Sequence, residues 1–143
     1  MEKKPPVYCY PAVFNDGEGF WSVRFPDLEN AFTTADTLDQ AILEAKTVLE
    51  ECLYFREESR DEIPQPTPLD EIRRSAGDAL VQLVVADMVQ ARREMSQRAV
   101  KKTLSIPYWM EEELKKVPTL NVSGLLQQAV IKELNLKEPY TAG

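Results

Sequence analysis

Residues 100–134, VKKTLSIPYWMEEELKKVPTLNVSGLLQQAVIKEL, carry the pattern of one strand followed by two helices. Polar and apolar residues alternate over residues 101–106, which is typical of a half-buried strand. Pro107 stands where a first helix would begin, because the first helical position needs no N–H partner. Asn121 is a good N-cap for a second helix, after which apolar residues recur at helical spacing.

Such a short stretch cannot form a stable unit by itself. A segment of about thirty-five residues usually needs a partner, a metal or disulfides to be stable. A single strand also leaves its backbone N–H and C=O groups unpaired. Pairing with the same strand of a second chain meets both needs, so the stretch predicts a homodimer. We expect five apolar residues to form the dimer interface: Leu104, Ile106, Leu125, Leu126 and Ala129.

This arrangement resembles the ribbon-helix-helix family of DNA-binding dimers. The resemblance is carried by Leu104, by Ile106-Pro107 and by the helix start Asn121-Val122-Ser123. It implies that a two-stranded ribbon enters the major groove, where outward-facing strand residues contact base edges. A pair of helices that dimerises without binding DNA is the alternative that the pattern leaves open.

The residues expected to contact DNA fall into two groups. Alternate residues of a strand share one face, so three polar residues would meet the bases: Lys101, Thr103 and Ser105. The N–H groups at the start of a helix can hold a phosphate. Three residues open the second helix in this way: Asn121, Val122 and Ser123.

The front half predicts a separate mixed domain of the α+β class. Strand patterns cover residues 7–14, 20–25, 31–34 and 79–86. A capping box at Thr37 starts a long helix after the third strand, and we expect this helix to end near Arg60. A proline-rich loop follows over residues 63–68. We therefore interpret residues 1–87 as a β-β-β-α-β domain, residues 88–98 as a linker and residues 99–143 as the dimerising tail.

Charge is divided unevenly between the two halves. Residues 1–87 hold 8 Lys and Arg against 18 Asp and Glu, a net charge of −10, whereas residues 88–143 hold 9 against 6, a net charge of +3. A basic tail suits the phosphate backbone of a nucleic acid. An acidic front suits a basic protein partner. The charge alone also allows a simpler explanation, in which the acidic residues only keep the front half soluble.

Several residue types that carry chemistry are missing or sparse. The chain has no histidine, the commonest general base and metal ligand, and its five glycines form no phosphate-binding loop. Cys9 and Cys52 have no metal-binding or redox spacing, so we expect two small buried residues in a reducing cytoplasm. We expect no metal and no cofactor. No apolar run is long enough for a membrane span, and the start lacks a signal-peptide pattern, so we expect a cytoplasmic protein.

Four carboxylates near strand ends raise the hypothesis of a magnesium-dependent nuclease: Asp16, Glu18, Asp27 and Asp36. Each of them also has a structural explanation. The first three lie in predicted turns, where polar residues are common, and the last precedes a helix start, where an acid interacts favourably with the helix dipole. We therefore expect no catalytic residues and no enzymatic activity.

The order of residues in the front half resembles the N-terminal domain of HicB antitoxins. The resemblance is carried by YPAVF at residues 10–14, FWSVRFPDL at residues 20–28, Phe32-Thr33, Asp36-Thr37-Leu38, Ala41 and the loop Ile63-Pro64. Together with the ribbon-helix-helix tail it covers residues 7–136. It implies a partial ribonuclease-H-like domain fused to a DNA-binding tail.

The HicB resemblance also implies a function. The front domain would bind and block a small basic HicA toxin that cleaves RNA, and the tail would bind operator DNA and repress the operon. Whether the dimers assemble further into tetramers stays open. Candidate toxin contacts are exposed aromatic and acidic residues of the first hairpins: Glu18, Trp21 and Asp27. The alternative function is a stand-alone transcription regulator whose front domain senses a ligand or a protein.

Overall fold

The computed structural model describes residues 4–137 and divides the chain into two compact units, Met1–Gln97 and Arg98–Gly143. The first unit contains a sheet, three helices and the hydrophobic core. The second contains two helices. Within the described residues, no helix has the length and apolar character needed to cross a membrane.

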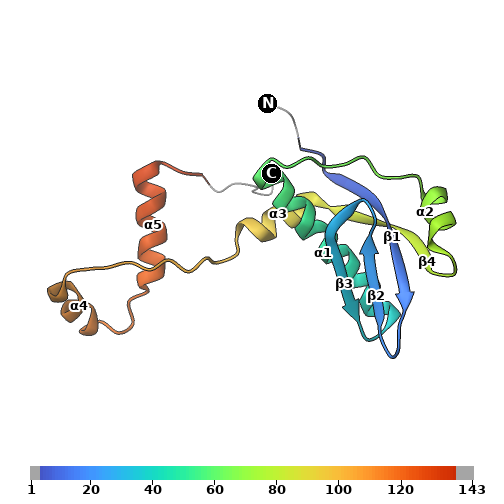
Figure 1. Cartoon of the computed structure of the whole chain (residues 1–143). Coiled ribbons are helices and arrows are strands. Elements are labelled where there is room, and N and C mark those ends of the chain that lie inside the picture. Colours follow the sequence, from blue (N-terminus) through green and yellow to red (C-terminus); the bar gives the residue numbers. More distant parts are fainter. Residues whose placement is uncertain (1–3, 138–143) are drawn as a thin grey trace. The chain divides into compact units, whose positions relative to one another are not determined.

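Four strands form one antiparallel sheet in the first unit: β1 (Val7–Asp16), β2 (Trp21–Phe25), β3 (Leu28–Ala35) and β4 (Leu80–Asp87). Their spatial order is β3-β2-β1-β4, so β3 and β4 form the two edges (Figure 1). In the β1–β2 turn, the N–H of Gly17 donates to the carbonyl of Phe20 at 2.8 Å. All four predicted strands are present, with ends shifted by three residues at most.

Helix α1 (Leu38–Ser59) covers one face of the sheet. The Thr37 side chain accepts a hydrogen bond from the N–H of Gln40 at 3.2 Å, as the capping-box pattern predicts. Small and branched side chains along one side of α1 are fully buried: Ala41, Ala45, Leu49 and Leu53. They pack against Tyr10, Phe14, Val23 and Phe25 of the sheet, which together form the main core.

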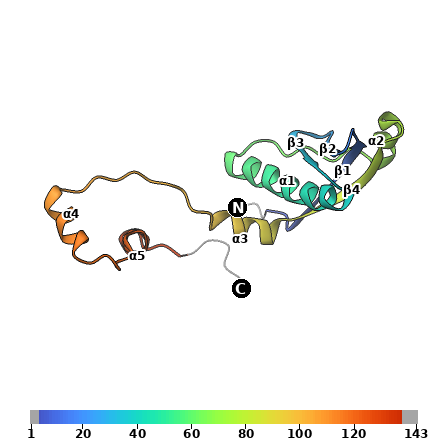
Figure 2. The same cartoon turned by 90° about the horizontal axis from the view of Figure 1, so that it is seen from below.

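Helix α2 (Leu69–Ala76), which the sequence patterns did not predict, lies on the opposite face of the sheet (Figure 2). Its Ile72 packs against Val13 of β1 and Val81 of β4 in a second, smaller core. The proline-rich loop leads from α1 to α2 and is tied down on the way. The Tyr10 hydroxyl donates to the carbonyl of Pro64, and the Thr67 N–H donates to Asp27 at 3.0 Å.

Helix α3 (Met88–Ser96) corrects the interpretation of residues 88–98 as a linker. It contacts α1, and its side chains at Met88, Ala91, Arg92 and Met95 are buried. Asp87 caps the helix by accepting from the N–H of Gln90 at 3.3 Å. The linker interpretation is therefore wrong for residues 88–96, because a helix that buries one full side belongs to the domain on which it packs.

The second unit contains α4 (Tyr108–Lys115) and α5 (Val122–Leu134), both close to their predicted positions. Residues 101–106, predicted to form a strand, have no regular secondary structure in the single chain. A ribbon strand would take its hydrogen-bond partners from a second chain, so an unpaired segment is what the dimer hypothesis expects of one chain. The α+β class is confirmed, whereas the ribonuclease-H-like and ribbon-helix-helix assignments stay predictions.

Candidate functional site

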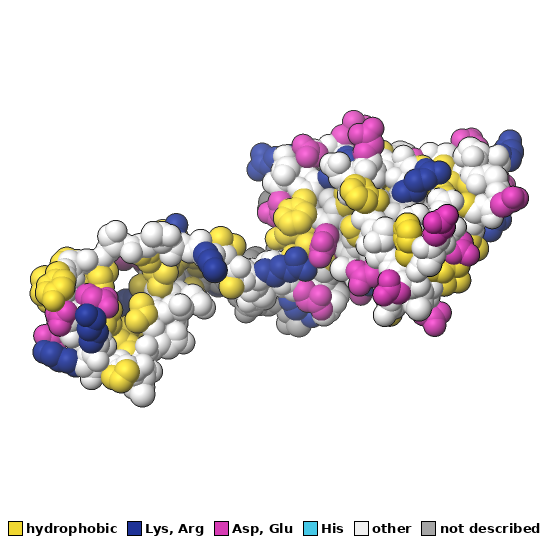
Figure 3. All heavy atoms as spheres, turned by 60° about the horizontal axis from the view of Figure 1, so that its bottom comes forward, with side chains coloured by type: hydrophobic (Ala, Val, Ile, Leu, Met, Phe, Trp, Pro, Cys, Tyr) yellow, Lys and Arg dark blue, Asp and Glu magenta, His cyan; other side chains and the backbone are white. Residues whose placement is uncertain are grey.

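The second unit presents an unusually apolar surface. None of residues 98–137 is buried in the single chain, although the two helices carry apolar side chains at helical spacing. Seven of the exposed apolar residues of this unit make up what we call the tail surface: Leu104, Ile106, Met110, Leu125, Leu126, Val130 and Leu134. Figure 3 shows hydrophobic side chains on this unit and acidic side chains spread over the first. A soluble monomer rarely exposes so many apolar residues together, so the tail surface indicates a protein interface.

The residues expected to read DNA lie next to the tail surface. Lys101, Thr103 and Ser105 are all exposed in the segment that precedes α4. Leu104 and Ile106, expected in the dimer interface, alternate with them and are 57% and 47% exposed. The alternation of polar and apolar residues is therefore intact and accessible in the single chain. Ala129, the last expected interface residue, is also exposed on α5.

The predicted cap of the second helix is confirmed. The side-chain oxygen of Asn121 accepts from the N–H of Gly124 at 3.0 Å. A Cβ at position 124 would lie 2.7 Å from the Asn121 amide nitrogen, so a side chain there would displace the capping amide. Val122 and Ser123 form the exposed first turn that follows. Nearby, Lys115 and Lys116 form exposed ion pairs with Glu112 and Glu113, at 3.3 and 3.0 Å.

In the first unit, the three candidate toxin contacts do not lie together. Glu18 is exposed in the β1–β2 turn, and Trp21 begins β2 at the same end of the sheet. Trp21 is half-buried against the main core. Asp27 lies beyond the other end of β2, and Thr67 donates to both of its carboxylate oxygens, at 3.0 Å from N and 2.5 Å from Oγ1. Sequence reasoning missed this structural use of Asp27.

The remaining carboxylates of the nuclease hypothesis are also dispersed. Asp16 and Asp36 are exposed, the first at the end of β1 and the second just before the Thr37 cap. Among residues 4–137, no group of three or more histidine, cysteine or acidic side chains is close enough to hold a metal ion. Cys9 and Cys52 are free and half-buried, rather than fully buried as expected.

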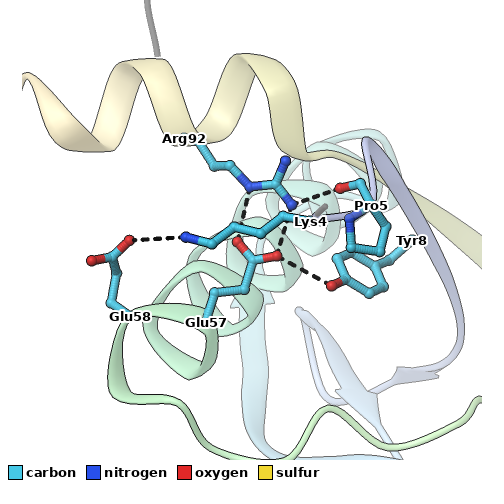
Figure 4. Close-up of polar contacts among 6 residues, drawn as sticks. All are labelled: Lys4, Pro5, Tyr8, Glu57, Glu58 and Arg92. Carbon is cyan, nitrogen blue, oxygen red and sulfur yellow. Dashed lines mark hydrogen bonds and ion pairs between the residues drawn. The ribbon is translucent and has the colours of Figure 1, made fainter. Parts of the chain in front are cut away.

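A buried ion pair joins α1 to α3 and is the centre of a cluster of polar contacts (Figure 4). The Arg92 guanidinium donates to both carboxylate oxygens of Glu57, at 2.9 Å from Nε and 2.7 Å from Nη2, and the two side chains are only 7% and 4% exposed. Arg92 also donates to the carbonyl of Pro5 at 2.6 Å, and the Tyr8 hydroxyl donates to Glu57 at 3.1 Å. The cluster fixes the start of β1, the end of α1 and α3 to one another.

The Glu57 cluster changes the acidity of its tyrosine. Burial, followed by the charge of Glu57 and the hydrogen bond to it, raises the pKa of Tyr8 to about 12. The pKa of Tyr8 rises because its ionised form, a tyrosinate, would lose its hydration and would face a carboxylate. Burial also raises the pKa of Tyr10, with a further contribution from the charge of Asp27.

A known protein family matches a stretch of this chain that lies within the first unit. Residues 8–92, from β1 into α3, match a family described as HicB_like antitoxin of bacterial toxin-antitoxin system. Antitoxin HicB 2 from Photorhabdus laumondii is 35% identical over 85 residues, which are 58% of this chain and 61% of that protein. The chain thus matches about three fifths of the length of this curated relative.

Two solved structures resemble a larger part of the chain. A chain of a toxin-antitoxin complex from Streptococcus pneumoniae is 26% identical with a TM-score of 0.53, and the match covers 89% of this chain and 99% of that one. The crystal structure of the antitoxin HicB from Burkholderia pseudomallei is 19% identical with a TM-score of 0.52, with coverages of 89% and 98%. Because the first unit ends at Gln97 of 143 residues, both matches extend into the second unit.

The family match includes every strand of the sheet, the covering helices α1 and α2, and the buried Arg92 of α3. It spans more than half of the chain and agrees with the identity to the curated antitoxin. The chain therefore belongs to the HicB-like antitoxin family of bacterial toxin–antitoxin systems.

Proposed function

We propose that this chain neutralises a basic, RNA-cleaving toxin of the HicA kind through its first unit. In the same proposal, a dimer of the second unit binds operator DNA and represses the operon that encodes both proteins. The observation that carries the proposal is the division of the chain into an acidic unit with its own core and a basic unit without one. Family membership supports the antitoxin half directly.

Electrostatics supports the choice of a basic partner for the first unit. An enzyme that binds RNA needs positive charge near the phosphates, and an acidic surface is complementary to it. Residues 1–97 hold 10 Lys and Arg against 19 Asp and Glu, a net charge of −9, whereas residues 98–143 hold 7 against 5, a net charge of +2. The same basic charge supports the assignment of DNA binding to the tail.

The toxin half is tested by co-production with the product of any neighbouring gene that encodes a short basic protein. We expect the two proteins to purify as one complex, and we expect the full-length chain to stop RNA cleavage by the isolated partner. A neighbouring protein that neither binds nor cleaves RNA would contradict this half, and would favour a stand-alone regulator instead.

The DNA half is tested by two neighbouring substitutions. Leu104→Asp would place a charge in the buried face of a ribbon, where an unpaired charge costs several kcal/mol. We expect it to abolish both the dimer, by light scattering, and operator binding. Ser105→Asp is the matched control, because it puts the same charge on the face that meets DNA. It should keep the dimer while losing the operator. A Leu104→Asp variant that stays dimeric through its tail would contradict the ribbon.

A further inference from the structure

A hollow of about 370 Å³ lies along the C-terminal half of α1 in the first unit. Its walls come from α1, from Asn30 on the edge strand β3 and from the turn after α1. The lining residues are Asn30, Val48, Glu51, Cys52, Phe55, Arg56, Ser59 and Asp61, and we call this hollow the α1 groove.

The inner wall of the α1 groove is apolar and firmly held. Val48 and Cys52 pack against the main core, so they cannot move freely. Phe55 stands at the opening with 58% of its surface exposed, and its ring meets the edge of Tyr54 at a centroid distance of 5.8 Å and an angle of 68°. An exposed aromatic ring in a fixed position beside a hollow has the properties of an anchor residue in protein interfaces.

The rim of the α1 groove is acidic. Glu51 and Asp61 line it, and Glu44 and Glu58 continue the line of Glu51 along the helix at seven-residue spacing. The only basic residue that lines the groove is Arg56, and its Nη1 donates to the carbonyl of Glu62 at 2.8 Å. Over its whole length α1 carries six acidic and two basic side chains. A partner that fills the groove should therefore present positive charge around an apolar side chain.

A second hollow of about 300 Å³ is adjacent and shares Arg56 and Asp61 with the first. It is also lined by Lys4 and Arg60, and its Glu57 is already paired with Arg92. The charges around this hollow are thus mixed, and it offers no acidic surface to a basic partner. Of these two adjacent hollows, the α1 groove is the one that suits a basic partner.

We infer that the α1 groove is the surface on which the basic toxin docks, with an apolar toxin side chain beside Phe55 and basic toxin side chains against Glu51 and Asp61. The inference rests on the proposed function and adds the location of the contact. It differs from the candidate contacts Glu18 and Trp21, which lie at the β1–β2 end of the sheet. A second copy of the chain is the less suitable occupant, because its first unit would bring the same negative charge to the rim.

Two pairs of substitutions in the full-length chain test the inference. Phe55→Ala removes the anchor, and Phe32→Ala is its matched control because Phe32 is 65% exposed on the other face of the sheet. Glu51→Lys reverses charge at the rim, and Glu18→Lys makes the same change at the other end of the sheet. Calorimetry with the purified toxin gives the Kd at two salt concentrations, and circular dichroism confirms that each variant is folded.

We expect Phe55→Ala and Glu51→Lys to raise the Kd by about tenfold or more, with the effect of Glu51→Lys shrinking at high salt. Both controls should stay within about twofold of the wild type. Equal binding by all four variants would overturn the inference while leaving the proposed function intact. A larger effect of Glu18→Lys than of Glu51→Lys would place the contact at the hairpin end instead.

Two further outcomes are distinguishable. A wild-type chain that does not bind the toxin would overturn the proposed function and the inference together. If Phe55→Ala changes the oligomeric state in light scattering but leaves toxin affinity unchanged, the groove is a contact between copies of this chain, and the inference is wrong.

Discussion

Arg92 helps to hold the end of the first unit in place through its buried ion pair with Glu57. We predict that Arg92→Leu lowers the free energy of unfolding by about 3–5 kcal/mol, because Glu57 would keep a buried charge without its partner. Urea-induced unfolding of the full-length chain, followed by circular dichroism, measures this loss.

The double variant Glu57→Leu/Arg92→Leu is the control for the Arg92 prediction. Replacing both charges by apolar side chains of similar size removes the unpaired charge, so most of the lost stability should return. A loss below about 1 kcal/mol for Arg92→Leu alone would mean that the pair behaves as a solvated surface pair.

Tyr8 should make the first unit sensitive to alkali. Its pKa is raised from 10.0 to about 12 in the folded chain, so folding favours the protonated hydroxyl. The resulting stability is fully present below the unfolded pKa and is lost as the pH rises from 10.0 towards 12. We predict that the free energy of unfolding falls more steeply over this range in the wild type than in Tyr8→Phe.

Urea titrations at several pH values measure the alkaline effect, and absorbance at the tyrosinate band follows the ionisation itself. Tyr108→Phe is a suitable control, because Tyr108 is 77% exposed in α4. If Tyr8→Phe and the wild type lose stability in parallel, the raised pKa of Tyr8 does not contribute to folding.

At the residue scale, the sequence predicted contacts that are local in the chain. The caps at Thr37 and Asn121 each join residues three positions apart, and both are present. The Glu57–Arg92 pair joins residues 35 positions apart. The sequence did not predict this pair, because helical spacing shows which side of α1 a residue occupies but not which distant helix covers it.

At the element scale, helices and strands with a strong hydrophobic periodicity were predicted, whereas those with a weak periodicity were missed. The four strands and α1 were predicted, whereas α2 and α3 were missed. The buried positions of α3 follow helical spacing, but one of them is occupied by Arg92, which a hydrophobicity pattern counts as polar. Helix α2 has only eight residues and begins directly after Pro68, and no element was predicted between the proline-rich loop and the fourth strand.

Asp27 and Thr67 control the path of the proline-rich loop between α1 and α2. Because hydrogen bonds to a charged group are worth about 1.5–3 kcal/mol, we predict a loss of that size for Asp27→Ala. We also predict faster proteolytic cleavage within residues 60–68. Urea unfolding and limited proteolysis of the full-length chain measure the two effects.

A double-mutant cycle separates the loop contact from other roles of Asp27. Asp27→Ala and Thr67→Ala should couple by about 0.5–3 kcal/mol, since each removes the partner of the other. Asp27→Asn, which keeps one carbonyl acceptor, should lose less than Asp27→Ala. Additive effects of the two alanine substitutions would contradict a direct contact between Asp27 and Thr67.

Members of this family are regulatory proteins rather than enzymes, which agrees with a structural role for the Asp27 carboxylate.

At the scale of the whole molecule, the sequence predicted two parts with different charge, and the structure divides the chain into two units. The boundary was predicted at residue 87 and lies at Gln97, because α3 packs on α1. The α1 groove was not predicted, since its walls come from three separate segments and no local motif marks it. The exposed apolar tail was predicted, because a stretch of this length is too short to bury its own apolar side chains.

The true end of the first unit gives the last prediction, a comparison of residues 1–97 with residues 1–87. The shorter fragment loses α3 and with it the buried Met88 and Met95, each worth about 1.5–3 kcal/mol of burial. It also leaves Glu57 without Arg92, at a further cost of about 3–5 kcal/mol. A small domain has only about 5–15 kcal/mol of stability in total, so we predict that residues 1–97 fold cooperatively while residues 1–87 are largely unfolded. Amide chemical-shift dispersion and thermal unfolding distinguish the two states. If both fragments fold with the same Tm, then α3 contributes nothing to the stability of the first unit.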